Sequence, residues 1–182
     1  MEYYTGPPTA GELELIERLR GREVTPEHLE VIELIAAGYL QPEVAARLHL
    51  AYDTVKSRVR RLRELAAYAQ LVEITGAAVL GGLVEPPAHD WFAVHDYRAS
   101  EAVRGEPLAP DERDVFARIL AGQTGPTIHR LTGFGINKVK YKFAIIYTKI
   151  GARNAYHAAG LSAAWRRKRW RLDEEEEKKS VA

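Results

Sequence analysis

Apolar residues recur every three or four positions through most of the chain, a spacing that predicts amphipathic helices and favours an all-α fold. The clearest stretch covers residues 24–65. Thr25 can cap a first helix there, and Pro26 suits its first position, where no backbone N–H partner is missed. Gly38 predicts the end of this helix. The apolar residues expected on its inner side are Leu29, Val31, Ile32, Leu34 and Ile35.

Two further helices are expected in the same stretch. A short one covers Gln41 to Leu48, and Pro42 lies in its first turn, where proline is tolerated. After a turn at residues 49–52, a longer helix begins near Asp53. Its apolar stripe is Val55, Val59 and Leu62, and its other face carries Lys56, Arg58, Arg60, Arg61 and Arg63. A short helix, a tight turn and a basic helix match what insertion into the major groove of DNA requires.

This stretch resembles the LuxR/FixJ-type (GerE-like) helix-turn-helix of bacterial regulators. The matching residues are Thr25-Pro26, Val31, Ala37-Gly38, Glu43-Val44-Ala45, Leu48, Leu50, Thr54-Val55-Lys56, Val59 and Leu62. The resemblance implies sequence-specific DNA binding in which Lys56, Ser57 and Arg60 face bases. It implies that Thr54, Arg58, Arg61 and Arg63 contact phosphates. The chain departs from the family at Arg58, usually His, at His49, usually Gly, and at Leu40 and Ala51, often Ser. The alternative interpretation is a small helical bundle with a solvated basic helix.

Composition agrees with a globular intracellular protein. The 182 residues are 46% hydrophobic and 28% charged, so the chain can bury a core and is not expected to be disordered. The absence of cysteine excludes disulfides and thiolate metal sites and fits a reducing cytoplasm. No signal peptide or membrane span is recognisable, so we expect a cytoplasmic, nucleoid-associated protein. The net charge of +1 is uninformative, but cations cluster on the basic helix and at residues 166–171.

The chain matches itself without gaps when it is shifted by 84 residues, which predicts two copies of one module. The identical pairs include Pro26 with Pro110, Val31 with Val115, Gly38 with Gly122, Pro42 with Pro126, Val55 with Val139, Lys56 with Lys140 and Gly76 with Gly160. The second copy resembles the same family, most clearly from Val139 to Asn154. By that resemblance Lys140 and Tyr141 face bases, and Lys138 and Lys142 contact phosphates. Ala109 and Ala144 replace the capping threonine and Arg60 of the first copy, which predicts a weaker or different base reader.

The predicted organisation has five parts, which are a flexible leader (1–9), a first module (10–83), a linker (84–97), a second module (98–165) and a basic, then acidic tail (166–182). The first module begins with a helix at 11–20 and ends with a continuous apolar helix at 66–83. In the resembled family a helix in the latter place makes the dimer contact. We therefore expect the segments 68–83 and 153–165 to pack as an intramolecular pseudo-dimer, or to form a homodimer.

The linker and the tail leave alternatives open. His89-Asp90 and His95-Asp96 match no standard metal-ligand spacing, so we expect no metal site, and Trp91 is expected to pin the linker to a module. The tail run 165–171 contains two tryptophans among its cations and could lie on phosphates or enter a minor groove. The other possibility is an extension of the last helix with pairs such as Arg169–Asp173.

No catalytic motif is present, so we expect neither an enzyme nor a cofactor. Double-stranded DNA is the expected partner, and the expected function is transcriptional regulation. Two alternatives remain. In one, the first module reads DNA and the second serves in dimerisation or protein interaction. In the other, the chain is a non-specific nucleoid or mobile-element DNA-binding protein.

Overall fold

A computed structural model describes the backbone of residues 7–85 and 106–181 and the side chains of 7–85 and 106–169. Over these residues the chain forms nine α-helices and no strands, so the prediction of an all-α fold is confirmed. The helices are α1 (Ala10–Leu19), α2 (Pro26–Ala36), α3 (Gln41–Arg47), α4 (Tyr52–Leu65), α5 (Leu71–Leu80), α6 (Pro110–Leu120), α7 (Gly125–Thr132), α8 (Ile136–Ile150) and α9 (Ala155–Val181). Most of the predicted linker and residues 98–105 lie outside the described residues.

The helix starts repeat along the chain. Helices α2, α3, α4 and α5 begin at residues 26, 41, 52 and 71, and α6, α7, α8 and α9 begin at residues 110, 125, 136 and 155. Each start in the second set therefore lies 84 residues after its counterpart, the same offset as in the sequence. The pairs α2/α4, α3/α4 and α2/α5 are in contact, and so are the corresponding pairs α6/α8, α7/α8 and α6/α9. We call α1–α5 the first unit and α6–α9 the second unit.

Each unit has its own apolar core. The first core contains Val31, Ile35, Val55, Leu62 and Ile74, each at most 1% exposed. The second core contains Val115, Ile119, Ile128, Val139 and Ile146, of which none is more than 2% exposed. Burial of the predicted stripe Val55, Val59 and Leu62 is confirmed. This stripe orients α4, because burying one face of the helix turns the opposite, cationic face outward.

Glutamates in the first helical turn complete several helix starts, and in α3, α5 and α6 the N-cap residue itself makes no side-chain hydrogen bond. Four backbone N–H groups donate to them, from Thr9 to Glu12 (2.8 Å), Leu40 to Glu43 (2.6 Å), Gln70 to Glu73 (2.8 Å) and Ala109 to Glu112 (2.8 Å). A carboxylate at this position satisfies an orphan donor and interacts favourably with the helix dipole. Leu40 and Ala109, which stand where the resembled family has hydroxyl residues, therefore do not disturb the helix starts. In the second unit Glu112 is also paired with Lys149 at 2.9 Å, and both side chains are buried.

The predicted continuous helix at 66–83 is wrong. Helix α4 ends at Leu65, and α5 begins only at Leu71. Between them Ala67 and Tyr68 adopt left-handed conformations, with φ of 51° and 63°. Alanine-rich composition predicted helix here, but the capping of Gln70 by Glu73 starts a new one. The break allows α5 to leave the direction of α4 and pack on the second unit.

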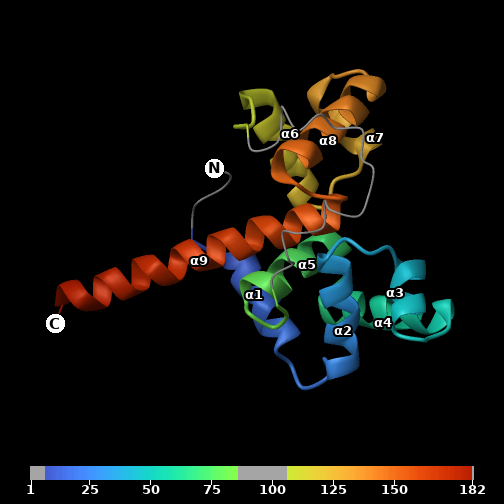
Figure 1. Cartoon of the computed structure of the whole chain (residues 1–182), viewed down its shortest axis with the longest axis vertical. Coiled ribbons are helices and arrows are strands. Elements are labelled where there is room, and N and C mark those ends of the chain that lie inside the picture. The colour runs from blue at the N-terminus through green and yellow to red at the C-terminus, as the bar shows by residue number, and fades with distance from the viewer. Residues whose placement is uncertain (1–6, 86–105, 182) are drawn as a thin grey trace.

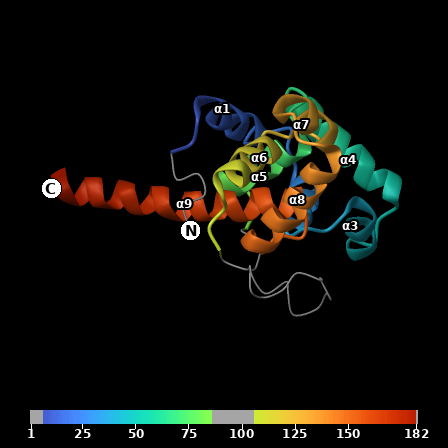
Figure 2. The same cartoon turned by 90° about the horizontal axis from the view of Figure 1, so that it is seen from above.

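The two units meet mainly where α5 lies beside α9, as both views of the molecule show (Figure 1 and Figure 2). The expected packing of segments 68–83 and 153–165 corresponds to this contact. The start of α9 also reaches the first unit, because Asn154 Nδ2 donates to the Gly38 carbonyl at 2.8 Å and Arg153 Nη2 donates to Glu43 Oε1 at 2.5 Å. Ala163 of α9 lies in the core of the first unit.

Helix α9 passes through the boundary that we expected at residue 166. It has 27 residues and continues without a break to Val181, so the tail extends the last helix, as one of the two alternatives supposed. Its final turns project beyond the other helices (Figure 1). The Arg169–Asp173 pair lies outside the described side chains. No helix in the described part of the chain is both long and apolar enough to cross a membrane.

Candidate nucleic-acid interface

The first candidate surface is built by α3, α4 and the four residues that join them. The turn closes through the Leu50 N–H, which donates to the Ala45 carbonyl at 2.9 Å. His49 takes the left-handed conformation with φ of 53°, and Gly133 occupies the corresponding position of the second unit with φ of 70°. Histidine is among the residues that tolerate this conformation. Histidine in place of glycine at residue 49 therefore still permits the tight turn that connects α3 to the start of α4.

The outward face of α4 carries most of the predicted contact residues. Five of them are exposed, namely Thr54, Lys56, Ser57, Arg60 and Arg61, whereas Arg58 and Arg63 are half-buried. The helix contains five cationic and two anionic residues, so this face has a positive field. Cations on one side of a narrow rod are the arrangement that can neutralise phosphates on both edges of a groove.

The exposed cations are held by nearby acids. Arg61 pairs with Glu23 and, at 3.4 Å, with Glu64, and Arg60 lies 3.9 Å from Glu64. Lys56 lies 3.5 Å from Asp53. Exposed ion pairs of this kind contribute about 0–1 kcal/mol each, so a strong external anion can displace them at little cost. The pairs arrange the side chains on the surface without blocking them.

A shallow groove beside α4 adds residues that the sequence analysis missed. Lys56, Ser57, Arg60 and Arg63 line it together with Gln41, Asp53, Val59 and Tyr68. Tyr68 is 71% exposed, and Tyr52, at the first position of α4, is 47% exposed with the Lys56 ammonium 5.4 Å from its ring centroid. Nothing in the sequence pointed to Tyr68, because a continuous helix was expected there. Tyr52 precedes the predicted helix start by one residue and was detectable as an aromatic at the end that would enter a groove.

The corresponding surface of α8 is poorer in free cations. Lys138, Lys140 and Tyr141 are exposed, as expected. Lys142 is not, since only 8% of it is accessible and its ammonium pairs with Asp111 of α6. This ion pair holds the pKa of Asp111 below its usual range. Lys142 stays a predicted phosphate contact, but it could reach a phosphate only by leaving Asp111.

Arg58 of the first unit occupies the position that corresponds to Lys142. Its Nη1 donates to the Glu27 carbonyl oxygen at 3.3 Å, and Glu27 corresponds to Asp111. In both units, therefore, a cation from the basic helix is tied to the first turn of the helix two elements earlier. The hydrogen bond from the Thr25 hydroxyl is the main cause that lowers the pKa of Glu27, and Arg58 adds to it. Arg58 thus links α4 to the first turn of α2 and is half-buried there.

The helix pairs that carry the two candidate surfaces lie at the same end of the molecule. In the two perpendicular views the pairs α3/α4 and α7/α8 occupy the end opposite to the projecting end of α9 (Figure 1 and Figure 2).

The described residues contain no cluster of three or more histidines, aspartates or glutamates suited to a metal ion. The His-Asp pairs at 89–90 and 95–96 and the aromatic residue at 91 lie outside the described part of the chain. Comparison with protein-family models, with curated proteins and with solved structures found no match for this chain.

Proposed function

We propose that the chain is a sequence-specific DNA-binding transcriptional regulator with two LuxR-like helix-turn-helix modules. The observation that carries this proposal is the exposed cationic face of α4. The short helix α3 precedes α4 and is joined to it by a turn of four residues. The recurrence of the same helix starts 84 residues later supports two modules rather than one. The resemblance of residues 24–65 to the family supports a role in transcription.

In this proposal α4 enters the major groove. Lys56, Ser57 and Arg60 read base edges, and Thr54, Arg61 and Arg63 bind phosphates. Lysine and arginine are suited to the guanine O6 and N7 acceptors, and a good base contact contributes about 1–3 kcal/mol of discrimination. The phosphate contacts supply affinity that falls with added salt, because bound cations release counterions from DNA. Arg58 acts mainly by positioning α4 through Glu27.

The second module extends the contact to a neighbouring half-site. On the exposed face of α8, Lys140 and Tyr141 read base edges and Lys138 binds phosphate. Because both modules belong to one chain, binding of the first places the second at a high effective concentration, and no association step is needed. The two basic helices differ in sequence, so an asymmetric operator is expected. The pseudo-dimer contact in this proposal is the one between α5 and α9.

The proposal is tested by competition binding of the whole protein at physiological salt. A duplex enriched from a random pool is labelled and displaced with itself or with a scrambled sequence of equal composition. A regulator is expected to prefer its own site by a factor of about 10³ or more. Equal displacement by both duplexes would favour the alternative of a non-specific nucleoid or mobile-element protein, and no binding to either would refute DNA recognition.

A second candidate function has a specific observation in its favour. Lys142 is buried and Ala144 stands in the place of Arg60, so α8 exposes few cations. In this alternative α4 alone reads DNA, and the second unit serves in dimerisation or protein interaction. Lys140→Ala distinguishes the two, because it weakens binding only if α8 touches DNA.

A further inference from the structure

The link between α8 and α9 contacts the first unit at the end of α2 and the start of α3. It consists of residues 151–154 and follows α8 directly in the chain. Arg153 Nη2 donates to Glu43 Oε1 at 2.5 Å, and Arg153 Nη1 donates to the Gly38 carbonyl at 3.3 Å. Asn154 Nδ2 donates to the same carbonyl at 2.8 Å. We call these three hydrogen bonds the clamp, because they join the two units.

Further hydrogen bonds within each unit hold the donors and acceptors of the clamp in place. Asn154 Oδ1 accepts the His157 N–H at 3.0 Å, so the amide nitrogen of Asn154 is left to face Gly38. Glu43 Oε2 accepts the Leu40 N–H at 2.6 Å, so its other oxygen is left to face the link. Gly38 has φ of +91°, and a Cβ added there would lie 3.2 Å from that of His157. The clamp therefore joins two helix starts, those of α3 and α9, whose local geometry is already fixed.

The clamp connects the two proposed DNA-reading helices through few intermediate elements. On one side, Arg153 and Asn154 belong to the link that follows α8. On the other side, Glu43 lies in the first turn of α3, and α3 packs on α4. The Leu50 N–H, which donates to the Ala45 carbonyl, closes the turn between α3 and α4. A shift of the link relative to α3 therefore changes the distance between α8 and α4.

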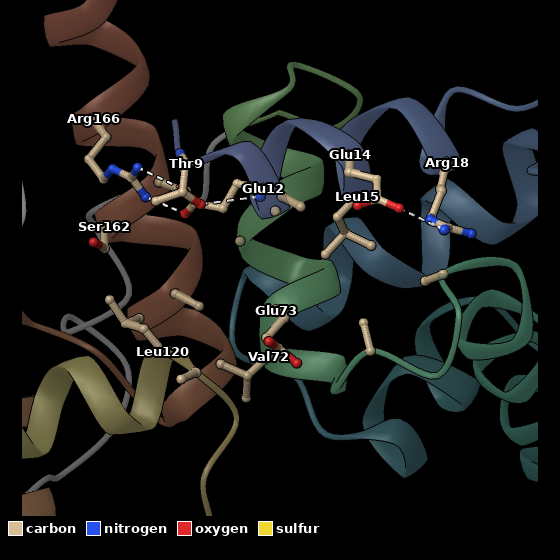
Figure 3. Close-up of a pocket in the computed structure, with 18 of the residues that line it drawn as sticks. Thr9, Glu12, Glu14, Leu15, Arg18, Val72, Glu73, Leu120, Ser162 and Arg166 are labelled. Atoms are coloured by element: carbon tan, nitrogen blue, oxygen red, sulfur yellow. Dashed lines mark hydrogen bonds and ion pairs between the residues drawn. The ribbon is translucent and has the colours of Figure 1, made fainter. Parts of the chain in front are cut away.

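Other polar contacts hold α9 to different helices of the first unit. Arg166 donates to Glu12 of α1 through two hydrogen bonds of 2.5 and 2.9 Å (Figure 3). Arg167 Nη1 donates to the Val79 carbonyl of α5 at 3.4 Å. Neither of these contacts involves α3 or α4. The clamp differs from them because Glu43 belongs to the helix that packs directly on α4.

The repeat does not reproduce the ion pair of the clamp. Arg153 corresponds to Ala69, and Glu43 corresponds to Thr127, at the offset of the repeat. Neither alanine nor threonine carries a charge, so the reciprocal contact around Gly122 cannot contain such a pair. The pair is therefore a feature of one side of the contact between the units, and not a consequence of the repeated fold. Its side chains are 24% and 38% exposed, so water screens the pair and its main effect is on geometry.

We propose that Arg153 and Asn154 are positioning residues that hold α8 at one distance from α4 and so restrict the protein to one spacing between its two half-sites. The consequence for DNA rests on the proposed function, whereas the fixed distance does not. One added base pair displaces the second half-site by about 3.4 Å and turns it by about 35° around the DNA axis. Two helices held at a fixed distance cannot follow this change, whereas two modules joined only by a flexible chain can.

The double variant Arg153→Ala/Asn154→Ser removes the clamp and preserves the start of α9. Serine is as good an N-cap residue as asparagine, but it lacks the amide donor that reaches Gly38. Arg113→Ala is the control. It removes the same charge from an exposed position on α6, outside the clamp.

The fixed distance is measured on the whole protein without DNA. The chain has no cysteine, so Ala51→Cys and Ala144→Cys, both exposed, place one spin label before α4 and one on α8. Pulsed electron paramagnetic resonance is expected to give one narrow distance distribution, which the control retains and the double variant broadens. Glu43→Gln is a milder second variant, because glutamine can still accept the Leu40 N–H, and it is expected to broaden the distribution less. Unchanged distributions in both variants would overturn the proposal.

The consequence for DNA is measured with duplexes that carry both halves of the selected site and differ by one base pair in the spacing between them. We expect the wild type and the control to lose about tenfold or more in affinity when one base pair is added or removed, and the double variant to lose about threefold or less. Equal tolerance of spacing in the wild type and the double variant would overturn the connection between the clamp and the DNA site. A protein that binds no DNA refutes the regulator, but the spin-label distances still decide whether the clamp fixes the two helices.

Discussion

Gly122, which follows α6, lies directly against the side chain of Gln70, which precedes α5, so that an added Cβ at Gly122 would clash with it. The corresponding glycine of the first unit, Gly38, lies against α9, and an added Cβ there would be 3.2 Å from the Cβ of His157. In each unit, therefore, the glycine that follows the first repeated helix packs against the last helix of the other unit. Gly38 follows α2 and meets α9, and Gly122 follows α6 and meets the start of α5. This reciprocity is what a pseudo-two-fold relation between two similar units would produce.

Gly122→Ala tests this contact between the units. Its φ of +68° makes any side chain unfavourable by about 1–2 kcal/mol, and the clash with Gln70 adds about 1–3 kcal/mol. Gly133→Ala is the matched control, because its φ of +70° is similar but an added Cβ meets nothing within 4 Å. Urea unfolding is expected to show the larger loss of stability for Gly122→Ala. Equal losses in the two variants would mean that the units do not pack in this way.

Substitution of Lys142 is expected to affect the stability of the fold, whereas substitution of Lys140 is not. Lys142→Ala removes a mostly buried cation from Asp111 and is predicted to lower the free energy of unfolding by about 1–3 kcal/mol. Lys140→Ala changes an exposed residue and is predicted to stay within about 0.5 kcal/mol of the wild type. Thermal unfolding of both variants makes the comparison. A stable Lys142→Ala protein with a reduced salt dependence of DNA binding would instead support Lys142 as a phosphate contact.

The two classes of contact on α4 predict different binding defects. Lys56→Ala removes a proposed base contact, so it is expected to weaken specific binding by about 1–3 kcal/mol and to relax sequence choice. Arg61→Ala removes a proposed phosphate contact, so it should weaken binding to every duplex and lower the salt slope by about one. Titration of cognate and scrambled DNA at several salt concentrations separates the two. Wild-type affinity and selectivity in Lys56→Ala would remove that residue from the interface.

His28 makes the stability of the first unit depend on pH. Burial, and then the nearby positive charge of Arg58, lower the pKa of its imidazole, and the Thr25 N–H donates to its Nδ1 at 3.1 Å. The folded protein therefore favours neutral His28, whereas histidine in an unfolded chain has a pKa of about 6.5. The contribution of neutral His28 to the free energy of unfolding is complete above that pH. It is lost as the pH falls, since the unfolded chain takes up the proton first.

His28→Gln keeps an acceptor at the same helix position but cannot be protonated in this range. The wild type is expected to lose more stability than this variant between about pH 7.5 and 5.5. Unfolding by urea at a series of pH values is the measurement, and the carboxylates common to both proteins cancel in the difference. Parallel pH profiles would show that His28 does not contribute.

Sequence periodicity was sufficient for the helices that bury one clear stripe. Thr25 and Gly38 bound the first repeated helix as predicted, and Val55, Val59 and Leu62 were correctly placed in the core. The alanine-rich residues between Leu65 and Leu71 have no such stripe of their own, and the stripe that begins at Leu71 suggested one continuous helix, so the break at Ala67 and Tyr68 was missed. It depends on two left-handed residues for which the sequence carries no glycine signal. The second unit does carry that signal, since Gly151 ends α8 with φ of 78°.

Sequence periodicity predicted the exposure of candidate residues that lie on the polar face of a helix. It could not predict the burial of a residue that pairs with another one far away in the sequence. Lys56, Arg60 and Arg61 point outward because the stripe opposite them is buried. Lys142 occupies an equally polar position in the sequence, but Asp111, 31 residues earlier, draws it into the fold. Tyr68 enters the groove only because of the broken helix. Pairing between elements of this kind cannot be derived from periodicity alone.

In vitro selection from a pool of random duplexes, at physiological salt, tests the central claim most directly. The whole protein is compared with Lys56→Ala and Lys140→Ala. Two modules that both read DNA predict a two-part motif, with one half lost in each variant. A single half-site that is lost only in Lys56→Ala would contradict the tandem reader, and selection without any enriched sequence would contradict sequence-specific binding altogether.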